Sequence, residues 1–236
     1  MSASRFDSIR DLPLFAQMHQ DSFDALTHGA FVQNFPPNMV MISEGEPADF
    51  LHIVQDGCVE LFSTWNNHET SVTTLYKNST FILAATIKDR PNLMSARTLQ
   101  KSRIVMVPSE NVRTVFRQDS AFAFAIVDEL ARCYRATIKN MKNLKLRSSL
   151  ERLANYVLKQ HHRHGDALAF DLPIEKRRLA SYLGMTPENL SRAFNNLKPH
   201  GVAVSGQRIE ILDLAALTAY AKPDRLIDDT TAEQAP

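Results

Sequence analysis

The sequence contains little cysteine. Only Cys58 and Cys133 occur among 236 residues, and they lie in separate segments without a C-x-x-C spacing. One chain therefore offers no cysteine set for an iron–sulfur cluster or a zinc site. Two free thiols are the simpler interpretation.

Long apolar runs are also missing. No window approaches the roughly 18 consecutive apolar residues of a membrane-spanning helix, and residues 1–7 lack the apolar stretch of a signal peptide. These absences predict a cytoplasmic protein without a membrane partner. The length favours two compact domains, since 44% hydrophobic and 22% charged residues are an ordinary globular composition.

The net charge of +1 hides an uneven distribution. Residues 139–200 contain 12 Lys or Arg against five Asp or Glu, whereas the remainder contains 15 against 21. The cationic segment is a candidate surface for a polyanion such as DNA. A solvated helical face is the alternative interpretation.

The first half of the chain has the pattern of antiparallel β-structure. From residue 31 to about residue 108, short segments rich in Val, Ile, Phe and Thr alternate with turn residues, which is typical of a barrel or sandwich. Asp56 and Gly57 separate two such segments, residues 51–54 and 59–62. Because glycine supplies the positive φ of a tight turn, we expect a β-hairpin here.

A helical pattern follows, with a short helix over residues 109–116 and a long one over residues 119–144. Apolar and small residues recur in the long helix at spacings of three and four, as in a coiled coil: Val127, Leu130, Tyr134, Thr137, Met141 and Leu144. This seam predicts dimerisation through the helix. Packing of the seam onto the chain's own barrel is the alternative.

The next helix begins after a hinge at residues 145–147. Ser148 and Glu151 have the spacing of a capping box, which satisfies free backbone donors at a helix start. The helix ends near His161, His162 and His164. We see no carboxylate at ligand spacing, so we expect a solvated helix end and no metal site.

Residues 176–197 have the features of a helix-turn-helix. Ala180 lets a second helix approach closely, Gly184 ends the first helix, and Leu190 fills the angle between the two. Thr186 and Pro187 are typical first residues of the second helix. The segment after this helix, residues 202–211, predicts a two-stranded wing that turns at Ser205 and Gly206.

Polar side chains on and before the second helix are the candidate DNA contacts. They comprise Lys176, Arg177, Arg178, Thr186, Glu188, Asn189, Ser191, Arg192 and Asn195. Glu188 and Arg192 project from one face, where they can read a G·C pair. We expect Lys176, Arg177 and Arg178 to bind phosphates.

Three segments carry a likeness to a known family: residues 44–49 and 51–61 in the barrel and residues 177–192 in the last third. With these segments and its order of barrel, long helix and winged motif, the sequence resembles the cyclic AMP receptor/FNR (Crp/Fnr) superfamily of bacterial transcription regulators. The resemblance implies an α+β fold with a cyclic-nucleotide-binding-like β-roll (jelly roll), a dimerisation helix and a winged helix-turn-helix. We expect a sensory domain at 1–118, the dimerisation helix and hinge at 119–145, a DNA-binding domain at 146–222 and a flexible tail at 223–236.

The resemblance also implies an effector pocket, but not one for cyclic AMP or cyclic GMP. The positions that match the nucleotide-binding pairs of the superfamily hold Leu83-Ala84 and Asn92-Leu93, which supply neither a ribose carboxylate nor a phosphate contact. We expect an unidentified small molecule in an apolar pocket lined by Phe81, Leu83, Ala84, Ala85, Leu93, Met94 and Tyr134. A filled core without an effector is one alternative. Haem is another, because His19, His28, His52 and His68 lie in this half.

The resulting expectation is a DNA-binding regulator and not an enzyme, since the sequence has no glycine-rich phosphate loop and no catalytic grouping. Double-stranded DNA, a second copy of the chain and RNA polymerase are the expected partners. Ser191 looks like the serine of FNR-type members, and Pro187 replaces a basic residue of the cyclic AMP receptor. We therefore expect half-sites closer to TTGA than to TGTGA.

Overall fold

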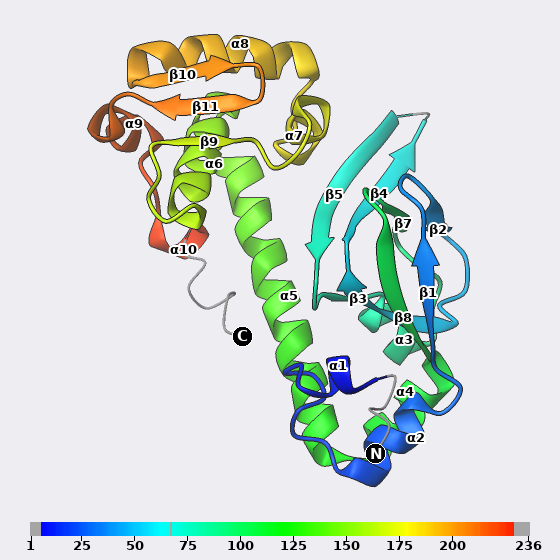
Figure 1. The fold of residues 1–236 in the computed structure, drawn as a ribbon. Coiled ribbons are helices and arrows are strands. Elements are labelled where there is room, and N and C mark those ends of the chain that lie inside the picture. Colours follow the sequence, from blue (N-terminus) through cyan, green and yellow to red (C-terminus); the bar gives the residue numbers. More distant parts are fainter. Residues whose placement is uncertain (1–5, 67, 229–236) are drawn as a thin grey trace. The chain divides into compact units, whose positions relative to one another are not determined.

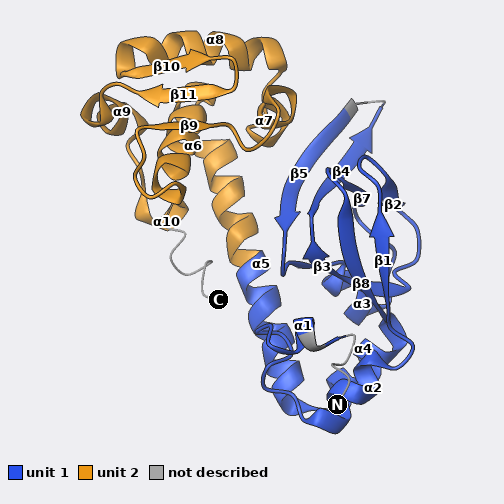
Figure 2. Ribbon diagram, in the orientation of Figure 1, with its two compact units in different colours: residues 1–133, 236 blue, residues 134–235 orange. Residues whose placement is uncertain are grey.

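The computed structural model describes residues 6–66 and 68–228. The chain forms two compact units, residues 1–133 and residues 134–235, and their boundary lies inside the longest helix, α5 (Ser120–Leu146) (Figure 2). Each unit has its own hydrophobic core. Within the described ranges, no helix is both long enough and apolar enough to cross a membrane.

The first unit contains a β-roll of two antiparallel four-stranded sheets (Figure 1). One sheet has the order β1 (Phe31–Phe35), β8 (Ser102–Pro108), β3 (Phe50–Asp56), β6 (Thr80–Phe81). The other has the order β2 (Val40–Ile42), β7 (Ser95–Thr98), β4 (Cys58–Trp65), β5 (His68–Tyr76). Both sheets contribute to one apolar cluster, which includes Val54, Phe81 and Ile104 from the first and Val59, Leu61 and Ala96 from the second. This arrangement confirms the expected β-roll.

Helices cover the other face of the first sheet. They are α1 (Asp7–Arg10), α2 (Gln20–Thr27), α3 (Leu83–Lys88), α4 (Ser109–Gln118) and the beginning of α5. Alternate strand residues point toward them, so Leu51 and Ile53 of β3 share a cluster with Phe122 and Ile126 of α5. The carboxylate of Asp119 accepts the backbone N–H of Phe122, which fixes the start of α5.

The prediction of a β-hairpin at Asp56 and Gly57 is wrong. Strands β3 and β4 do meet there, but β3 pairs with β8 and β6, whereas β4 pairs with β5 and β7. The turn carries the chain from one sheet to the other. Gly57 has φ +97°, and a Cβ at this position would lie 2.6 Å from the Cα of Ser102. Glycine is needed here both for its conformation and because β8 begins against it.

His52 is a buried polar side chain inside the roll. Its ring stacks on Phe81 with centroids 5.0 Å apart, and its Nδ1 has no hydrogen-bond partner. Burial lowers the pKa of His52 to about 4, because a charged imidazolium would lose its hydration. The ring is therefore neutral at physiological pH.

The second unit holds the end of α5 and a winged helix-turn-helix. Its helices are α6 (Ser149–Arg163), α7 (Lys176–Tyr182), α8 (Pro187–Leu197), the 3₁₀ turn η1 (Lys198–His200), α9 (Leu214–Ala221) and α10 (Arg225–Asp228). Its small sheet has the order β10 (Val202–Ser205), β11 (Arg208–Ile211), β9 (Ala169–Asp171). Ser148 caps α6 in the expected capping box with Glu151. One apolar cluster joins α6, α7, α8, α9 and the three strands.

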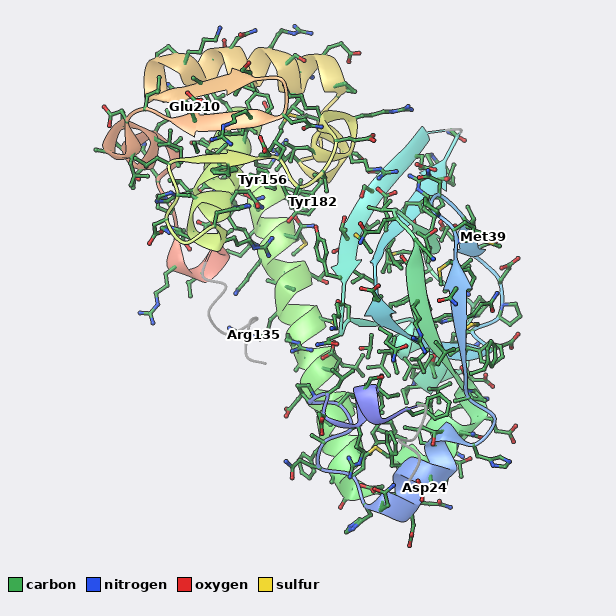
Figure 3. All side chains as sticks on the ribbon, in the orientation of Figure 1. Asp24, Met39, Arg135, Tyr156, Tyr182 and Glu210 are labelled. Atoms are coloured by element: carbon green, nitrogen blue, oxygen red, sulfur yellow. The ribbon has the colours of Figure 1, made fainter. Side chains whose placement is uncertain are left out.

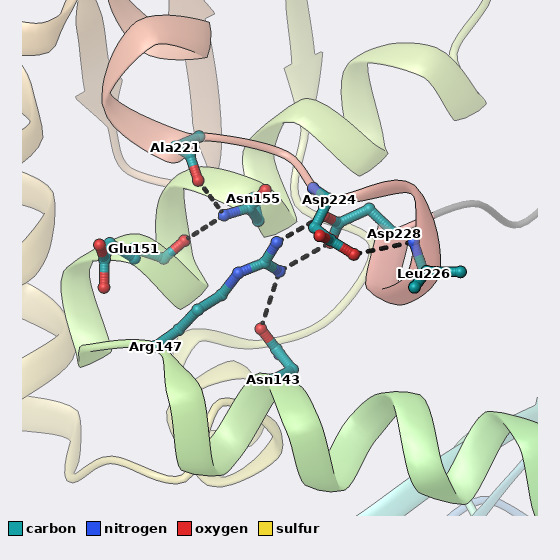
Figure 4. Close-up of polar contacts among 8 residues, drawn as sticks. All are labelled: Asn143, Arg147, Glu151, Asn155, Ala221, Asp224, Leu226 and Asp228. Carbon is teal, nitrogen blue, oxygen red and sulfur yellow. Dashed lines mark hydrogen bonds and ion pairs between the residues drawn. The ribbon is translucent and has the colours of Figure 1, made fainter.

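The expected tail at 223–236 is wrong for its described part. Residues 225–228 form α10, and the guanidinium of Arg147 binds both carboxylate oxygens of Asp228, at 2.7 and 2.5 Å (Figure 4). Asn143 of α5 accepts a further hydrogen bond from Arg147. The side chain of Arg147 is only 8% exposed, so its charge needs this partner. Residues 229–236 lie outside the described ranges.

The neutral, buried His52 makes the stability of the first unit depend on pH. In the unfolded chain the imidazole takes up a proton near pH 6.5, whereas the folded state resists protonation down to about pH 4. Protons therefore bind the unfolded chain more readily than the folded one between pH 6.5 and about pH 4. The free energy of unfolding is unaffected by the titration of His52 above pH 6.5 and falls by about 3 kcal/mol as the pH is lowered to about 4. Thermal unfolding between pH 7.5 and 4.5 measures it. We expect His52→Phe to flatten the decline and exposed His28→Gln to leave it unchanged; an equal decline in all three proteins would contradict the assignment.

Candidate DNA-binding interface

The turn between α7 and α8 is determined by three consecutive residues. Gly184 has φ +63° and its N–H binds the carbonyl of Ser181, while the N–H of Met185 binds the carbonyl of Ala180. This pair of bonds is a Schellman motif, which closes a helix with a left-handed residue. The Thr186 hydroxyl then accepts the N–H of Asn189 and starts α8. The predicted helix boundaries are confirmed.

Helix α8 is held in place by its apolar side. Leu190, Ala193, Phe194 and Leu197 are at most 5% exposed, and they pack in one cluster with Leu179, Ala180 and Leu183 of α7. Tyr156 of α6 and Tyr182 of α7 meet edge to face with centroids 6.2 Å apart (Figure 3). The predicted inner faces of both helices are therefore confirmed. The opposite side of α8 is left for another partner.

The candidate base-reading residues lie on that opposite side. Glu188, Asn189, Ser191, Arg192 and Asn195 are all exposed along α8. They offer carboxylate, amide, hydroxyl and guanidinium groups, which together can read base edges in a major groove.

The basic residues at the start of α7 differ in their freedom. Arg177 is exposed, whereas Lys176 and Arg178 are half-buried. The ammonium of Lys176 lies 5.3 Å from the centroid of the Phe194 ring, in a cation–π contact. Lys176 thus helps to join α7 to α8, a role that its sequence position did not indicate.

Glu188 is held ionised at the N-terminus of α8. Hydrogen bonds from its own backbone N–H and from the Thr186 hydroxyl lower the pKa of Glu188, and the positive charge of Arg192 lowers it further. The Glu188 carboxylate, an acceptor, and the Arg192 guanidinium, a cationic donor, lie one helical turn apart on an exposed face of α8. This pairing suits the amino group of cytosine and the O6 and N7 atoms of guanine.

The wing forms as expected. Strands β10 and β11 pair from Val202↔Ile211 to Ser205↔Arg208, and Gly206 turns the chain with φ +56°. The third strand, β9, was not expected. It has three residues, too few to show an alternating pattern, and it pairs with β11 through Ile209↔Phe170.

Arg152 is a further site residue that the sequence did not single out. Its guanidinium donates to the carbonyls of Leu183 at 2.8 Å and Gly184 at 3.3 Å, and to those of Arg147 at 2.7 Å and Leu144 at 3.4 Å. These carbonyls belong to the ends of α7 and α5, where backbone acceptors lack helical partners. Burial lowers the pKa of Arg152. One side chain thus joins the end of α5 to the turn of the helix-turn-helix.

Most of the predicted seam on α5 is open. Val127, Tyr134, Met141 and Leu144 are 55%, 68%, 42% and 40% exposed, and Thr137 is exposed as well. Leu130 differs, because it is half-buried against the helical cluster of the first unit. Phe124, 73% exposed and three residues before Val127, extends the open apolar row. The i, i+3 spacing is the signal that could have identified it.

The residues expected to line an effector pocket have different environments within their own units. Phe81 and Met94 pack in the cluster between the sheets, and Leu83 packs in the cluster under the helices. The other members are exposed or half-exposed: Ala84, Ala85, Leu93 and Tyr134. None of the seven lines the hollow of about 440 Å³ beside β1, β3 and α4, which contains Asp49, Asp89, Glu110 and Arg113 among its walls.

Two residues at the positions that match the superfamily's nucleotide-binding pairs have structural roles here. Leu83 is buried, and the side chain of Asn92, only 4% exposed, donates to the carbonyl of Pro47. Of the histidines considered for haem, His52 is buried and His19 and His28 are exposed. The side chain of His68 lies outside the described part.

The end of α6 contains a possible ligand set that the sequence analysis overlooked. We expected no carboxylate at ligand spacing near His161, His162 and His164, but Asp166 lies there. Ligand atoms of His161, His162 and Asp166 are all within 4.8 Å of one another. The expectation failed because the chain reverses at Gly165 and returns Asp166 toward the helix.

Comparisons with known proteins agree with both units. Residues 32–119 match the family model of the cyclic nucleotide-binding domain, and residues 151–220 match that of the Crp-like helix-turn-helix domain. The chain is 22% identical over 186 residues to the transcriptional activator protein anr of Pseudomonas aeruginosa, covering 77% of this chain and 76% of the relative. It is 23% identical over 215 residues to the CRP-like cAMP-activated global transcriptional regulator of Mycobacterium tuberculosis, covering 89% and 96%.

A solved structure shares the fold. FixK2 from Bradyrhizobium japonicum superimposes with a TM-score of 0.67 at 21% identity, covering 81% of this chain and 96% of FixK2. The two family models and the curated relatives identify the same group of proteins, and FixK2 shares the fold. The chain belongs to the Crp/Fnr superfamily of bacterial transcription regulators and carries its helix-turn-helix DNA-binding domain.

Proposed function

We propose that the protein is a homodimer that binds an inverted-repeat operator with α8 in the major groove, and that its DNA affinity is controlled through the β-roll. The observation that carries the proposal is the division of α8. Its buried side, with Leu190 and Phe194, holds the helix rigidly, and its exposed side presents Glu188, Ser191 and Arg192. A rigid helix with exposed polar side chains is what direct readout requires.

Base and phosphate contacts have separate carriers in this proposal. Glu188 and Arg192 read a G·C pair, Ser191 favours a TTGA-like half-site, and Arg177 binds phosphate together with Lys176, Arg178 and Thr186. Two-fold symmetry places the half-site centres about one helical turn, or 34 Å, apart.

Selection from random DNA tests the proposal and should return a palindrome. Arg192→Ala should weaken binding to the selected site by about 1–3 kcal/mol and relax the preference at the guanine, because its bidentate contact is lost. Arg177→Ala is the matched control, since it removes the same charge. It should weaken all sequences alike and reduce the salt dependence. An Arg192→Ala protein with full sequence preference would contradict the assignment.

The exposed row on α5 supports the dimer. Phe124, Val127 and Tyr134 would leave a long apolar stripe in water, and a second copy of the helix would cover it. Leu130 serves the first unit's own core, so it is a poor position for testing association.

Val127→Glu with Tyr134→Glu should therefore give monomers that lose specific DNA binding while keeping their secondary structure. Both side chains are more than half exposed, so the charges do not enter a core. Sedimentation and circular dichroism provide the measurements. Arg135→Glu, an exposed neighbour outside the seam, is the control and should remain dimeric. A wild-type protein that is monomeric at micromolar concentration would refute the dimer.

For the effector, we propose that cyclic AMP and cyclic GMP are not the signals, in contrast to the cAMP-activated relative. Leu83 and Asn92 are buried in structural roles and supply no phosphate contact. A regulator without a small-molecule effector is the second candidate. The packing of Phe81 and Met94 into the cluster between the sheets favours it. We further propose RNA polymerase as a partner, as the superfamily resemblance implies.

A further inference from the structure

The C-terminal end of α6 has a precisely determined geometry. The N–H of Gly165 binds the carbonyl of His162, and the N–H of Asp166 binds the carbonyl of His161, which is a Schellman motif. Gly165 and Asp166 have φ +65° and +61°. Two successive left-handed residues fold the chain back, so the carboxylate of Asp166 lies over the last helical turn.

Three possible metal ligands meet at this turn. The Nδ1 of His162 is 2.7 Å from Oδ1 of Asp166, and the Nε2 of His161 is 3.6 Å from the same oxygen. Ligands around a tetrahedral ion with bonds of about 2.0 Å are about 3.3 Å apart. All three ligand atoms lie within 4.8 Å of one another, and the side chains of His162 and Asp166 are about 70% exposed, so both can rotate toward this spacing.

His161 is the oriented member of the set. It is 3% exposed, and its Nδ1 lies 2.9 Å from the carbonyl of Ala167. A carbonyl can only accept, so Nδ1 carries the proton and the Nε2 lone pair faces Asp166. A backbone carbonyl behind an imidazole is the usual arrangement of a metal-ligating histidine.

We propose that His161 Nε2, His162 Nδ1 and Asp166 bind a divalent transition-metal ion, with Zn²⁺ as the fitting ion. Two imidazoles and one carboxylate suit Zn²⁺, whereas Ca²⁺ and Mg²⁺ prefer oxygen ligands. The negative end of the α6 dipole adds a favourable field for a cation. Three protein ligands leave the fourth position to water.

Metal binding at this turn stabilises the wing in this proposal. The carbonyl of Leu168, two residues after Asp166, accepts the N–H of Ile211 in β11. The loop that follows the site leads directly into β9, which pairs with β11. An ion that joins the end of α6 to the loop therefore restrains the strand on which the wing is built.

Calorimetric titration of the metal-free, full-length protein with ZnCl₂ tests the site. We expect one ion per chain, and we expect bound Zn²⁺ to raise the thermal midpoint of the second unit by several degrees. His162→Gln and Asp166→Asn should each weaken binding at least 10-fold and abolish the rise. Both replaced side chains are exposed, and Asn tolerates the left-handed conformation of Asp166, so each variant should fold.

His164→Gln is the matched control. His164 belongs to the same helix end, but it stacks on Phe170 and its Nδ1 lies 2.8 Å from the carbonyl of Gln160. This variant should bind Zn²⁺ as the wild type does. Failure of the wild type to bind, equal binding by His162→Gln, or an equal loss in His164→Gln would each overturn the proposal. Calcium chloride should give no comparable heat.

Discussion

The arrangement of the DNA-binding unit depends on one guanidinium. Arg152 donates to the terminal carbonyls of two helices, α5 and α7, whose ends would otherwise leave acceptors unsatisfied. Besides these hydrogen bonds, the positive charge of Arg152 interacts favourably with the negative end of each helix dipole. The Cδ2 of Leu144 would lie 3.0 Å from a Cβ at Gly184, so the two ends are in close contact as well. A displacement of the C-terminal end of α5 therefore also moves the turn that precedes α8.

Two further polar side chains, Asn155 and Arg147, join elements of the DNA-binding unit. Asn155 joins α6 to α9 by donating to the carbonyls of Glu151 and Ala221, and Arg147 joins the hinge to α10 (Figure 4). Hydrogen bonds to Asp228 raise the pKa of Arg147, because they stabilise its charged form. The apolar cluster supplies the cohesion of the unit, and these directional contacts determine how its helices meet.

Features encoded by neighbouring residues could be predicted from the sequence. Thr186 and Pro187 mark the start of α8, and Gly184 marks the turn before it. Ser148 marks the start of α6. These positions could be predicted because each residue interacts with backbone groups no more than one helical turn away. Long-range partners could not be predicted. The turn at Gly57 has hairpin chemistry, yet its flanking strands pair with distant strands in two sheets. The residues expected around an effector were chosen by likeness to the superfamily's nucleotide-binding positions, but side chains that are close in sequence enter different clusters, such as Phe81 between the sheets and Leu83 under the helices.

The clasp between Arg147 and Asp228 also bears on how the chain is made. The two residues are 81 positions apart, and the hinge between α5 and α6 is emerging from the ribosome long before its carboxylate partner. Until Asp228 has been made, the guanidinium of Arg147 has no carboxylate partner and stays hydrated. The last described turn of the chain then completes the hinge. Closing so long a loop adds little entropic cost over a shorter one, since that cost grows only logarithmically with length. The junction between α5 and α6 thus receives its ionic partner only when the last described helix has been made.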